Sequence, residues 1–116
     1  MSIEIVNKKF YKRPSEYIGR PSPLGNPYSY KEKSIAKFKV SNTEEAISKY
    51  EIWLYEQIKC GNKEVINEIN RLLNIARNGD LFLGCWCVPF GDCHGRIVKE
   101  LLERVLKNER KRNQTN

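Results

Sequence analysis

The sequence lacks long apolar runs and lacks the features of a targeting segment. Its apolar stretches are only a few residues long, and residues 1–4 are not a charged leader followed by an apolar segment. We therefore expect neither a membrane-spanning helix nor a signal peptide, and we predict a cytoplasmic protein without a membrane partner. In such a reducing compartment the four cysteines favour buried thiols, a metal site or a reactive thiol over a disulfide framework.

The sequence also lacks a zinc finger, a homeodomain and an RNA-binding sheet motif. Its 21 Lys and Arg against 14 Asp and Glu give a net charge of +7, which favours anionic partners. Part of this excess lies in the polar run 107–116, which we expect to be a basic tail following a single domain of residues 1–106. The remainder is scattered through the N-terminal third without the spacing of a groove-reading helix. Small anions are therefore ranked above nucleic acid, for which charge is the only argument.

The apolar residues that are present predict one small α/β domain. They make up 40% of the chain, enough to bury a core. Short strands are expected over residues 3–6 and 16–19, and residues 36–40 alternate as in an edge strand or a hairpin arm. Residues 81–87 are apolar on both alternating faces, which indicates a central strand that is covered on both sides.

Helical periodicity follows in the rest of the chain. A first helix is expected to begin at the capping box of residues 41–44 and to end at residues 60–61. Asn62 is expected to cap a second helix that ends at residues 78–79, and Asp92 to cap a third. The combination predicts a Rossmann-like sheet, in a two-layer or three-layer arrangement, with about three helices and no second domain.

Chemically distinctive residues gather in one segment, 85–95, which holds three of the four cysteines, the single histidine and one of the two tryptophans. It has the pattern of a strand, a loop and a helix. Cys93, His94 and Gly95 then lie in the first turn of that helix, after the carboxyl end of a central strand, where α/β sheets bind ligands. Helix N-termini attract anions, and Arg96 adds a positive charge, so we expect a phosphate or carboxylate there.

The same cysteines have other interpretations. Cys85 and Cys87 fit small core residues of a buried strand. Zinc is an alternative, because Cys85, Cys87, Cys93 and His94 provide four suitable donors. The spacing argues against zinc, since adjacent Cys93 and His94 at a helix start project in divergent directions. No cofactor is therefore expected, and zinc stays an alternative.

A second candidate site is the loop of residues 20–28, where three prolines prevent regular structure. We expect a positive φ at Gly25. Arg20 suits bidentate recognition of phosphate, and Asn26 suits a base or a ribose. The alternative is a structural turn in which Asn26 bonds its own backbone and Tyr28 fills the core.

The two loops together define one predicted ligand site, in which Tyr28 or Trp86 would stack on a base. The predicted ligand-binding residues are Arg20, Ser22, Gly25, Asn26, Tyr28, Trp86, Cys93, His94, Gly95 and Arg96.

Two motifs carry a resemblance to a known family. Residues 17–28 read YIGRPSPLGNPY, and residues 85–87 and 93–95 read CWC and CHG. These motifs, with the helix that contains residues 45–54, resemble a small domain-of-unknown-function family of phages and bacteria. The likeness spans nearly the whole chain, to which this sequence adds residues 60–78 and the basic tail. It implies a phage or prophage setting, hence the host cytoplasm, and it implies no activity.

Two functional interpretations remain. In the first, the protein is a binding module, and a homo-oligomer, that captures a nucleotide-type ligand and in a phage sequesters a host immune signalling nucleotide. In the second, it is an enzyme acting on a nucleoside, nucleotide or NAD-like substrate through Cys93 or His94. The carboxylates Glu16, Asp80 and Asp92 suit a surface charge, a turn and a helix cap better than catalysis, so binding is preferred. A nucleic-acid-binding or zinc-binding accessory protein is a further alternative.

Overall fold

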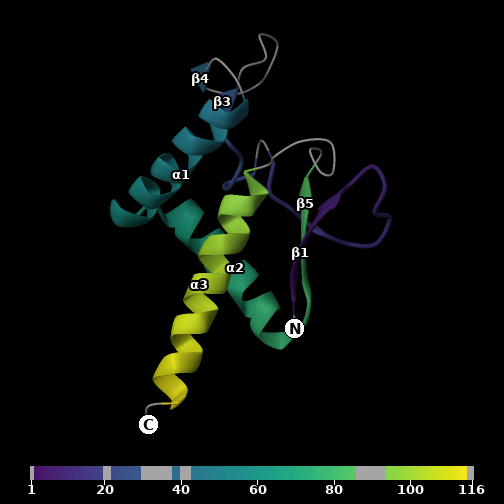
Figure 1. Cartoon of the computed structure of the whole chain (residues 1–116), viewed down its shortest axis with the longest axis vertical. Coiled ribbons are helices and arrows are strands. Elements are labelled where there is room, and N and C mark those ends of the chain that lie inside the picture. Colours follow the sequence, from purple (N-terminus) through teal and green to yellow (C-terminus); the bar gives the residue numbers. More distant parts are fainter. Residues whose placement is uncertain (1, 20–21, 30–37, 40–42, 86–93, 115–116) are drawn as a thin grey trace.

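A computed structural model of the chain describes residues 2–19, 22–29, 38–39, 43–85 and 94–114. Within these residues it contains three helices, one three-stranded sheet and one two-stranded sheet (Figure 1). The elements follow the order β1, β2, β3, β4, α1, α2, β5, α3. The predicted α/β class is confirmed.

The larger sheet is parallel and has β5 (Leu81–Cys85) at its centre, between β1 (Ile3–Asn7) and β2 (Glu16–Tyr17). β1 pairs with β5 along its whole length, whereas β2 pairs with it over two residues. The prediction that residues 81–87 supply the central strand is therefore confirmed over 81–85. A strand that is central and parallel must be covered on both faces, which explains its continuous apolar sequence.

The smaller sheet consists of β3 (Tyr28–Ser29) and β4 (Phe38–Lys39). These two strands run parallel. A hairpin arm would pair antiparallel with its neighbour, so that alternative for residues 36–40 is wrong, and the edge-strand alternative holds over residues 38–39.

The helices are α1 (Thr43–Lys59), α2 (Lys63–Asn78) and α3 (Gly95–Gln114). Gly61 takes a φ of 80° between α1 and α2, a conformation that glycine adopts without steric cost. The side-chain oxygen of Asn62 then accepts two backbone N–H groups of the first turn of α2, at 3.1 and 3.4 Å. The predicted cap at Asn62 is confirmed.

The predicted caps Ser41 and Asp92 lie outside the described residues. α3 continues to Gln114, so residues 107–114 of the expected tail form its last turns. Arg77 of α2 pairs with Glu109 there, with an N–O distance of 2.5 Å. Among the residues described, no helix is long and apolar enough to span a membrane.

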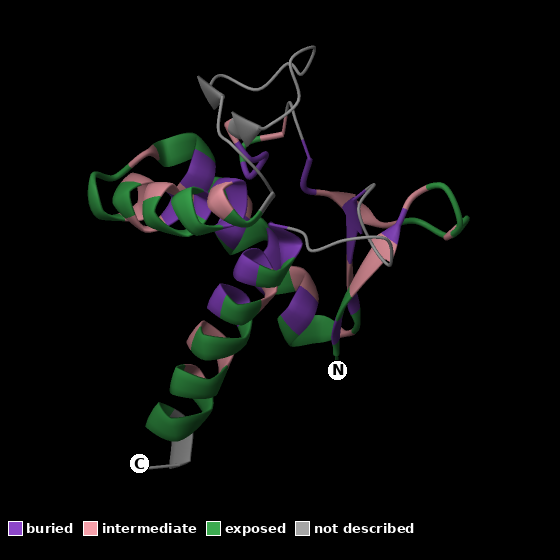
Figure 2. Ribbon diagram, turned by 45° about the horizontal axis from the view of Figure 1, so that its top comes forward, coloured by how far each residue is buried: buried purple, intermediate pink, exposed green. Residues whose placement is uncertain are grey.

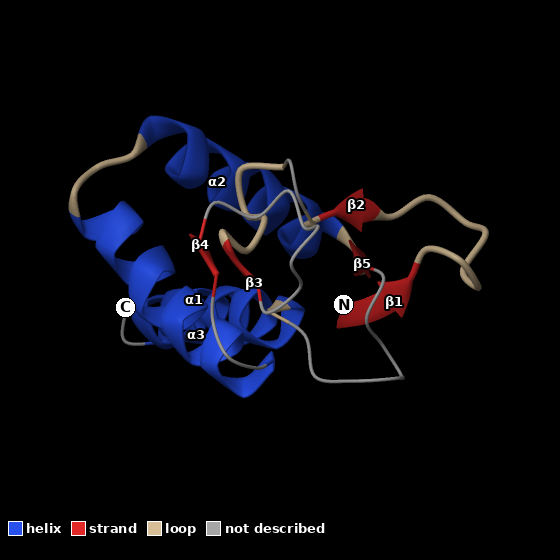
Figure 3. Ribbon diagram, turned by 90° about the horizontal axis from the view of Figure 1, so that it is seen from above, coloured by secondary structure: helices blue, strands red, loops and turns tan. Residues whose placement is uncertain are grey.

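All three helices lie on one side of the three-stranded sheet, so the described part of the chain has the two-layer arrangement (Figures 1 and 3). The buried residues lie where the helices meet each other and the sheet (Figure 2). Leu81 and Leu83 of β5 are fully buried in this core, together with Leu72 of α2 and Val98 and Leu102 of α3. The apolar periodicity of the sequence thus identifies the helix-covered face correctly.

The other face of the sheet is covered by the segment that connects β1 to β2. The ring of Tyr11 stacks on that of Phe82, with centroids 5.2 Å apart. Gly84 lies beneath Lys8 and Ser15, and a Cβ atom at Gly84 would stand 2.7 Å from the Ser15 Oγ. Glycine at this position of β5 therefore lets the connection lie directly on the sheet.

Candidate functional site

The candidate site lies at the carboxyl edge of the three-stranded sheet. The strands are parallel, so their last residues, Asn7, Tyr17 and Cys85, stand at the same edge. The N-terminus of α3 approaches this edge, as Figure 3 shows when the molecule is seen from above. Ligands of open α/β sheets bind at such an edge, so the location agrees with the prediction from sequence.

His94 joins the two predicted motifs. Its Nε2 atom lies 2.7 Å from the backbone oxygen of Ile18, which belongs to the first motif. A carbonyl oxygen can only accept, so Nε2 carries the hydrogen. The His94 carbonyl oxygen accepts the N–H groups of Ile97 and Val98 at 3.0 and 3.3 Å, so His94 directly precedes α3 and accepts its first backbone hydrogen bonds. Its exposed fraction is 9%, so it acts as an internal link between the motifs.

Two side chains connect the first motif to α1. The hydroxyl of Tyr50 donates to the Leu24 carbonyl oxygen at 2.7 Å, and the Asn26 amide donates to the Ala46 carbonyl oxygen at 3.2 Å. The Tyr50 ring meets the His94 ring edge-on, with centroids 5.0 Å apart and planes at 75°. We call this set the loop–helix junction; its residues are Ile18, Leu24, Asn26, Ala46, Tyr50 and His94.

Tyr50 is the residue of this junction that the sequence interpretation missed. It lies on the apolar stripe of α1, where its spacing alone predicts a core position. It is fully buried, with an exposed fraction of 0%. A tyrosine at a fully buried position needs a partner for its hydroxyl, and that requirement is the signal that would have identified it.

The loop after β2 makes two tight turns before it reaches α1. The Ser22 N–H donates to Gly19 and the Gly25 N–H donates to Ser22, at 2.8 and 2.9 Å. The expected positive φ at Gly25 is wrong, because among the described glycines it occurs at Gly61. The bond from Gly25 to Ser22 closes a four-residue turn in which Gly25 is the last residue, a position that needs no left-handed conformation. A side chain at Gly19, however, would collide with the Tyr17 ring.

The predicted polar residues of this loop occupy two different environments. The Asn26 amide is buried and donates to the Ala46 carbonyl oxygen of α1, a partner that lies 20 residues away in the sequence. The Ser22 Oγ is also buried, and it has no hydrogen-bond partner among the residues that the structure describes. Burying a hydroxyl without a hydrogen-bond partner costs free energy, so the Ser22 hydroxyl is the described group best suited to bond to a ligand.

Several predicted site residues lie outside the described parts of the chain: Arg20, Trp86, Cys87 and Cys93. The backbone of Tyr28 lies in β3, and its side chain is outside the description. Cys85 is described and buried. No cluster of three His, Cys, Asp or Glu side chains suited to a metal occurs among the described residues. With Cys87 and Cys93 undescribed, zinc binding stays a prediction.

The first turn of α3 differs electrostatically from those of the other helices. It carries no acidic residue and has Arg96, whereas Glu44 and Glu45 lie in the first turn of α1 and Glu64 in that of α2. Carboxylates at those positions offset the positive end of the helix dipole. Arg96 is half-exposed and stands 3.4 Å from Glu100 on the same helix. Arg96 thus adds positive charge at the end of α3 where the helix dipole is already positive.

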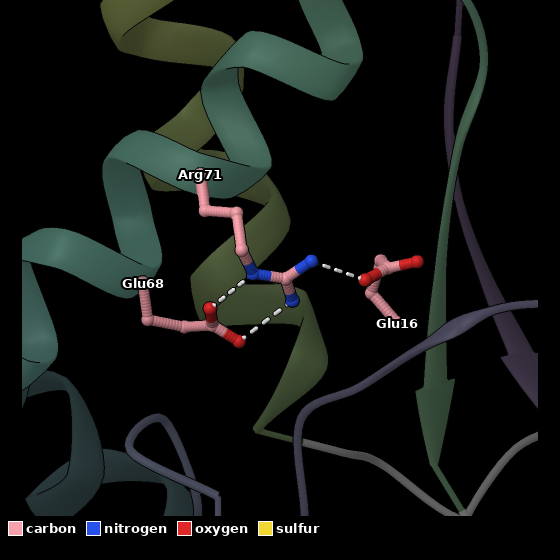
Figure 4. Close-up of polar contacts among 3 residues, drawn as sticks. All are labelled: Glu16, Glu68 and Arg71. Carbon is pink, nitrogen blue, oxygen red and sulfur yellow. Dashed lines mark hydrogen bonds and ion pairs between the residues drawn. The ribbon is translucent and has the colours of Figure 1, made fainter.

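The described carboxylates that were considered for catalysis are engaged elsewhere. Glu16 accepts a bond from Arg71 at 2.5 Å, and Glu68 holds the same guanidinium from α2 (Figure 4). The hydrogen bonds that Arg71 donates to Glu68 and then to Glu16 raise the pKa of its guanidinium. Asp80 precedes β5 and accepts from Ser2, at the amino edge of the sheet. The Glu16 ion pair fastens α2 to β2, and Asp80 lies at the wrong edge for the site.

The comparisons with known proteins give one finding. Residues 4–104 match the model of a family described as a domain of unknown function, DUF4326. No curated protein and no solved structure matches the chain.

Proposed function

The chain belongs to this family of unknown function, and on that premise we propose that it binds a phosphate-bearing, nucleotide-type small ligand at the loop–helix junction. The observation that carries the proposal is the hydrogen bond between His94 and Ile18. It brings the two motifs, 76 residues apart in sequence, to one place at the carboxyl edge of the sheet. That edge is where α/β sheets of this kind take ligands.

The proposal divides the predicted residues into two roles. Asn26 and His94 are positioning residues, because each is buried and bonded to a backbone carbonyl of another segment. Ser22 and Arg96 are contact residues, since one has a hydroxyl without a described partner and the other is half-exposed beside the helix N-terminus. A phosphate at this turn would meet the helix dipole and a guanidinium together.

The remaining predicted contacts, which the sequence alone proposes, complete the site. Arg20 would bind phosphate, Tyr28 or Trp86 would stack on a base, and Cys93 would lie at the start of α3 beside Gly95. In a phage, such a protein would act as a homo-oligomer that sequesters a signalling nucleotide of the host immune response.

The first experiment is native mass spectrometry of the protein purified from cells, followed by calorimetric titration with ADP. Arg96→Ala should weaken ADP binding by about tenfold or more, because a charge-assisted hydrogen bond is lost. Lys107→Ala is the matched control, since it removes one positive charge from the far part of the same helix. ADP affinity should change less than about twofold in that control, because exposed charges a Debye length away are screened.

Each outcome of this experiment has a defined meaning. A nucleotide released on denaturation, or selective loss of ADP binding in Arg96→Ala, supports the proposal. An equal loss of ADP affinity in both variants would mean that the net charge of the protein, and not a contact from Arg96, causes the loss. Absence of a released nucleotide together with absence of ADP binding contradicts the proposal, and conversion of ADP to a product replaces it with the enzyme alternative.

A further inference from the structure

The segment between β1 and β2 concentrates positive charge in one place. Residues 5–15 contain four Lys and Arg and no Asp or Glu. We call the part from Lys8 to Arg13 the basic loop; in Figure 1 its connection projects from the side of the sheet opposite the helices. Lys9, Lys12 and Arg13 are exposed. The cations of this short segment are therefore presented together on one projecting surface.

The basic loop has a defined turn at its base. The Asn7 side-chain oxygen accepts the Lys9 N–H at 2.8 Å, and the Asn7 carbonyl oxygen accepts the N–H groups of Phe10 and Tyr11 at 3.1 and 2.9 Å. Asn7 itself is 8% exposed. With the backbone fixed in this way and the Tyr11 ring stacked on the sheet, Phe10 is the residue that the turn presents outward.

Phe10 has an exposed fraction of 57%, which is unusual for an aromatic side chain of this size. The Lys9 ammonium lies 5.8 Å from the centre of its ring. The Lys8 ammonium lies 5.8 Å from the centre of the Tyr17 ring, so the basic loop has a second cation beside an aromatic ring. The carboxylate that follows the loop, Glu16, is already paired with Arg71.

We propose that the basic loop binds single-stranded nucleic acid, with Phe10 stacking on a base and Lys9, Lys12 and Arg13 contacting phosphates. Proteins that bind single strands combine these two elements, an aromatic platform for a base and cations along the backbone. Binding of this kind depends little on sequence, because every base has a face that can stack. This surface is separate from the loop–helix junction, and the inference does not depend on the proposed small ligand.

The same observations argue against two other partners. A DNA duplex would hide its base faces from Phe10, and the loop has no helix or strand pair to enter a groove. A membrane would require Phe10 to enter the apolar layer with the Lys9 ammonium beside its ring, and one phenylalanine is a small anchor beside four charges. Phosphate, in contrast, suits an ammonium in that position.

Fluorescence anisotropy with labelled 20-nucleotide oligothymidylate and oligouridylate tests the proposal and separates DNA from RNA. Phe10→Ala should weaken binding about tenfold, because one stacking contact is lost, and Phe10→Tyr should retain binding. In the wild type, the logarithm of affinity should fall with the logarithm of salt concentration with a slope of about −2, as expected for three phosphate contacts. Phe10 is exposed, so circular dichroism should show an unchanged fold.

The matched control removes an equal charge elsewhere. Lys9→Ala, Lys12→Ala and Arg13→Ala together should abolish detectable binding, whereas the triple change Lys107→Ala, Arg110→Ala and Lys111→Ala, on exposed α3 positions, should leave most of it. Equal losses in the two triple variants, unchanged binding in Phe10→Ala, or binding to phosphatidylserine vesicles without binding to either oligonucleotide would overturn the proposal. ADP titration of Phe10→Ala should give the wild-type affinity, so failure here is distinguishable from failure of the small-ligand site.

Discussion

The core between the helices and the sheet and the loop–helix junction hold the same fold together by different means. In the core, side chains such as Leu72, Leu83 and Leu102 contribute apolar surface and no hydrogen bonds. In the junction, Tyr50 and His94 are also buried, yet each forms a directed bond to a backbone carbonyl oxygen, Tyr50 to Leu24 and His94 to Ile18. Apolar packing tolerates adjustment, whereas these bonds fix particular segments against one another.

This difference has a functional meaning. A core of apolar side chains explains why the helices cover the sheet, but it does not determine where the loop after β2 lies. The bond from Tyr50 holds Leu24 against α1, and the bond from His94 holds Ile18, directly after β2, against the start of α3. Positional precision of this kind is what the proposed binding site would need.

The largest effect should come from the core. Leu83→Ala removes a fully buried side chain from the central strand and should lower the free energy of unfolding by about 2–5 kcal/mol. Urea unfolding monitored by circular dichroism measures it. Ile52→Ala, at a position that is 61% exposed on α1, is the control and should change stability by less than about 0.5 kcal/mol. Comparable losses of unfolding free energy in the two variants would show that the burial of Leu83 or the exposure of Ile52 is assigned wrongly.

The junction should come next, and α1 provides a matched pair of hydroxyls to test it. Tyr50→Phe leaves the buried Leu24 carbonyl oxygen without this donor and should cost about 1–3 kcal/mol. Tyr55→Phe removes a hydroxyl that accepts from exposed Arg104 at 2.9 Å, and it should cost less than about 0.5 kcal/mol. Hydrogen exchange should show faster opening of residues 18–26 in Tyr50→Phe alone. Identical behaviour of the two variants would remove the distinction between core and junction.

The same distinction separates what the sequence predicts from what it does not. The central strand at residues 81–85, the Asn62 cap and the apolar stripe of α3 follow from patterns a few residues long, so each is predictable. The bond from Tyr50 to Leu24 joins residues 26 apart and leaves no periodic signal. The stacking of Tyr11 on Phe82, which covers the second face of the sheet, is likewise a long-range match without a local pattern.

For the candidate site, the sequence predicts that the two motifs meet at the carboxyl edge of the sheet, and the bond between His94 and Ile18 brings them together there, whereas ligand binding at that edge stays a prediction. The sequence does not indicate that Asn26 and His94 are committed to carbonyl oxygens inside the protein. Residue type alone cannot separate a polar side chain that positions a loop from one that contacts a ligand. That distinction depends on burial and partners, which become visible only after folding.

The smallest effect should come from a directed bond that is exposed. Arg77 and Glu109 link α2 to α3, and the Arg77 hydrogen bond, followed by its charge, lowers the pKa of Glu109 below 4.5. A lowered pKa in the folded state means that the stabilisation is complete above pH 4.5 and is lost as the pH falls through the folded-state value. The carboxyl chemical shift of Glu109, followed by NMR between about pH 2 and 6, should titrate at higher pH in Arg77→Met.

Because both partners of this ion pair are accessible to water, Arg77→Met should shift the thermal midpoint far less than Tyr50→Phe does. The comparison therefore separates two properties of a hydrogen bond, its directionality and its burial. The Arg77–Glu109 bond and the Tyr50–Leu24 bond are both directional, but only the Tyr50–Leu24 bond is inside the protein. A loss of stability in Arg77→Met as large as that in Tyr50→Phe would mean that directed bonds stabilise this fold wherever they lie, and the junction would then have no special role in holding the site.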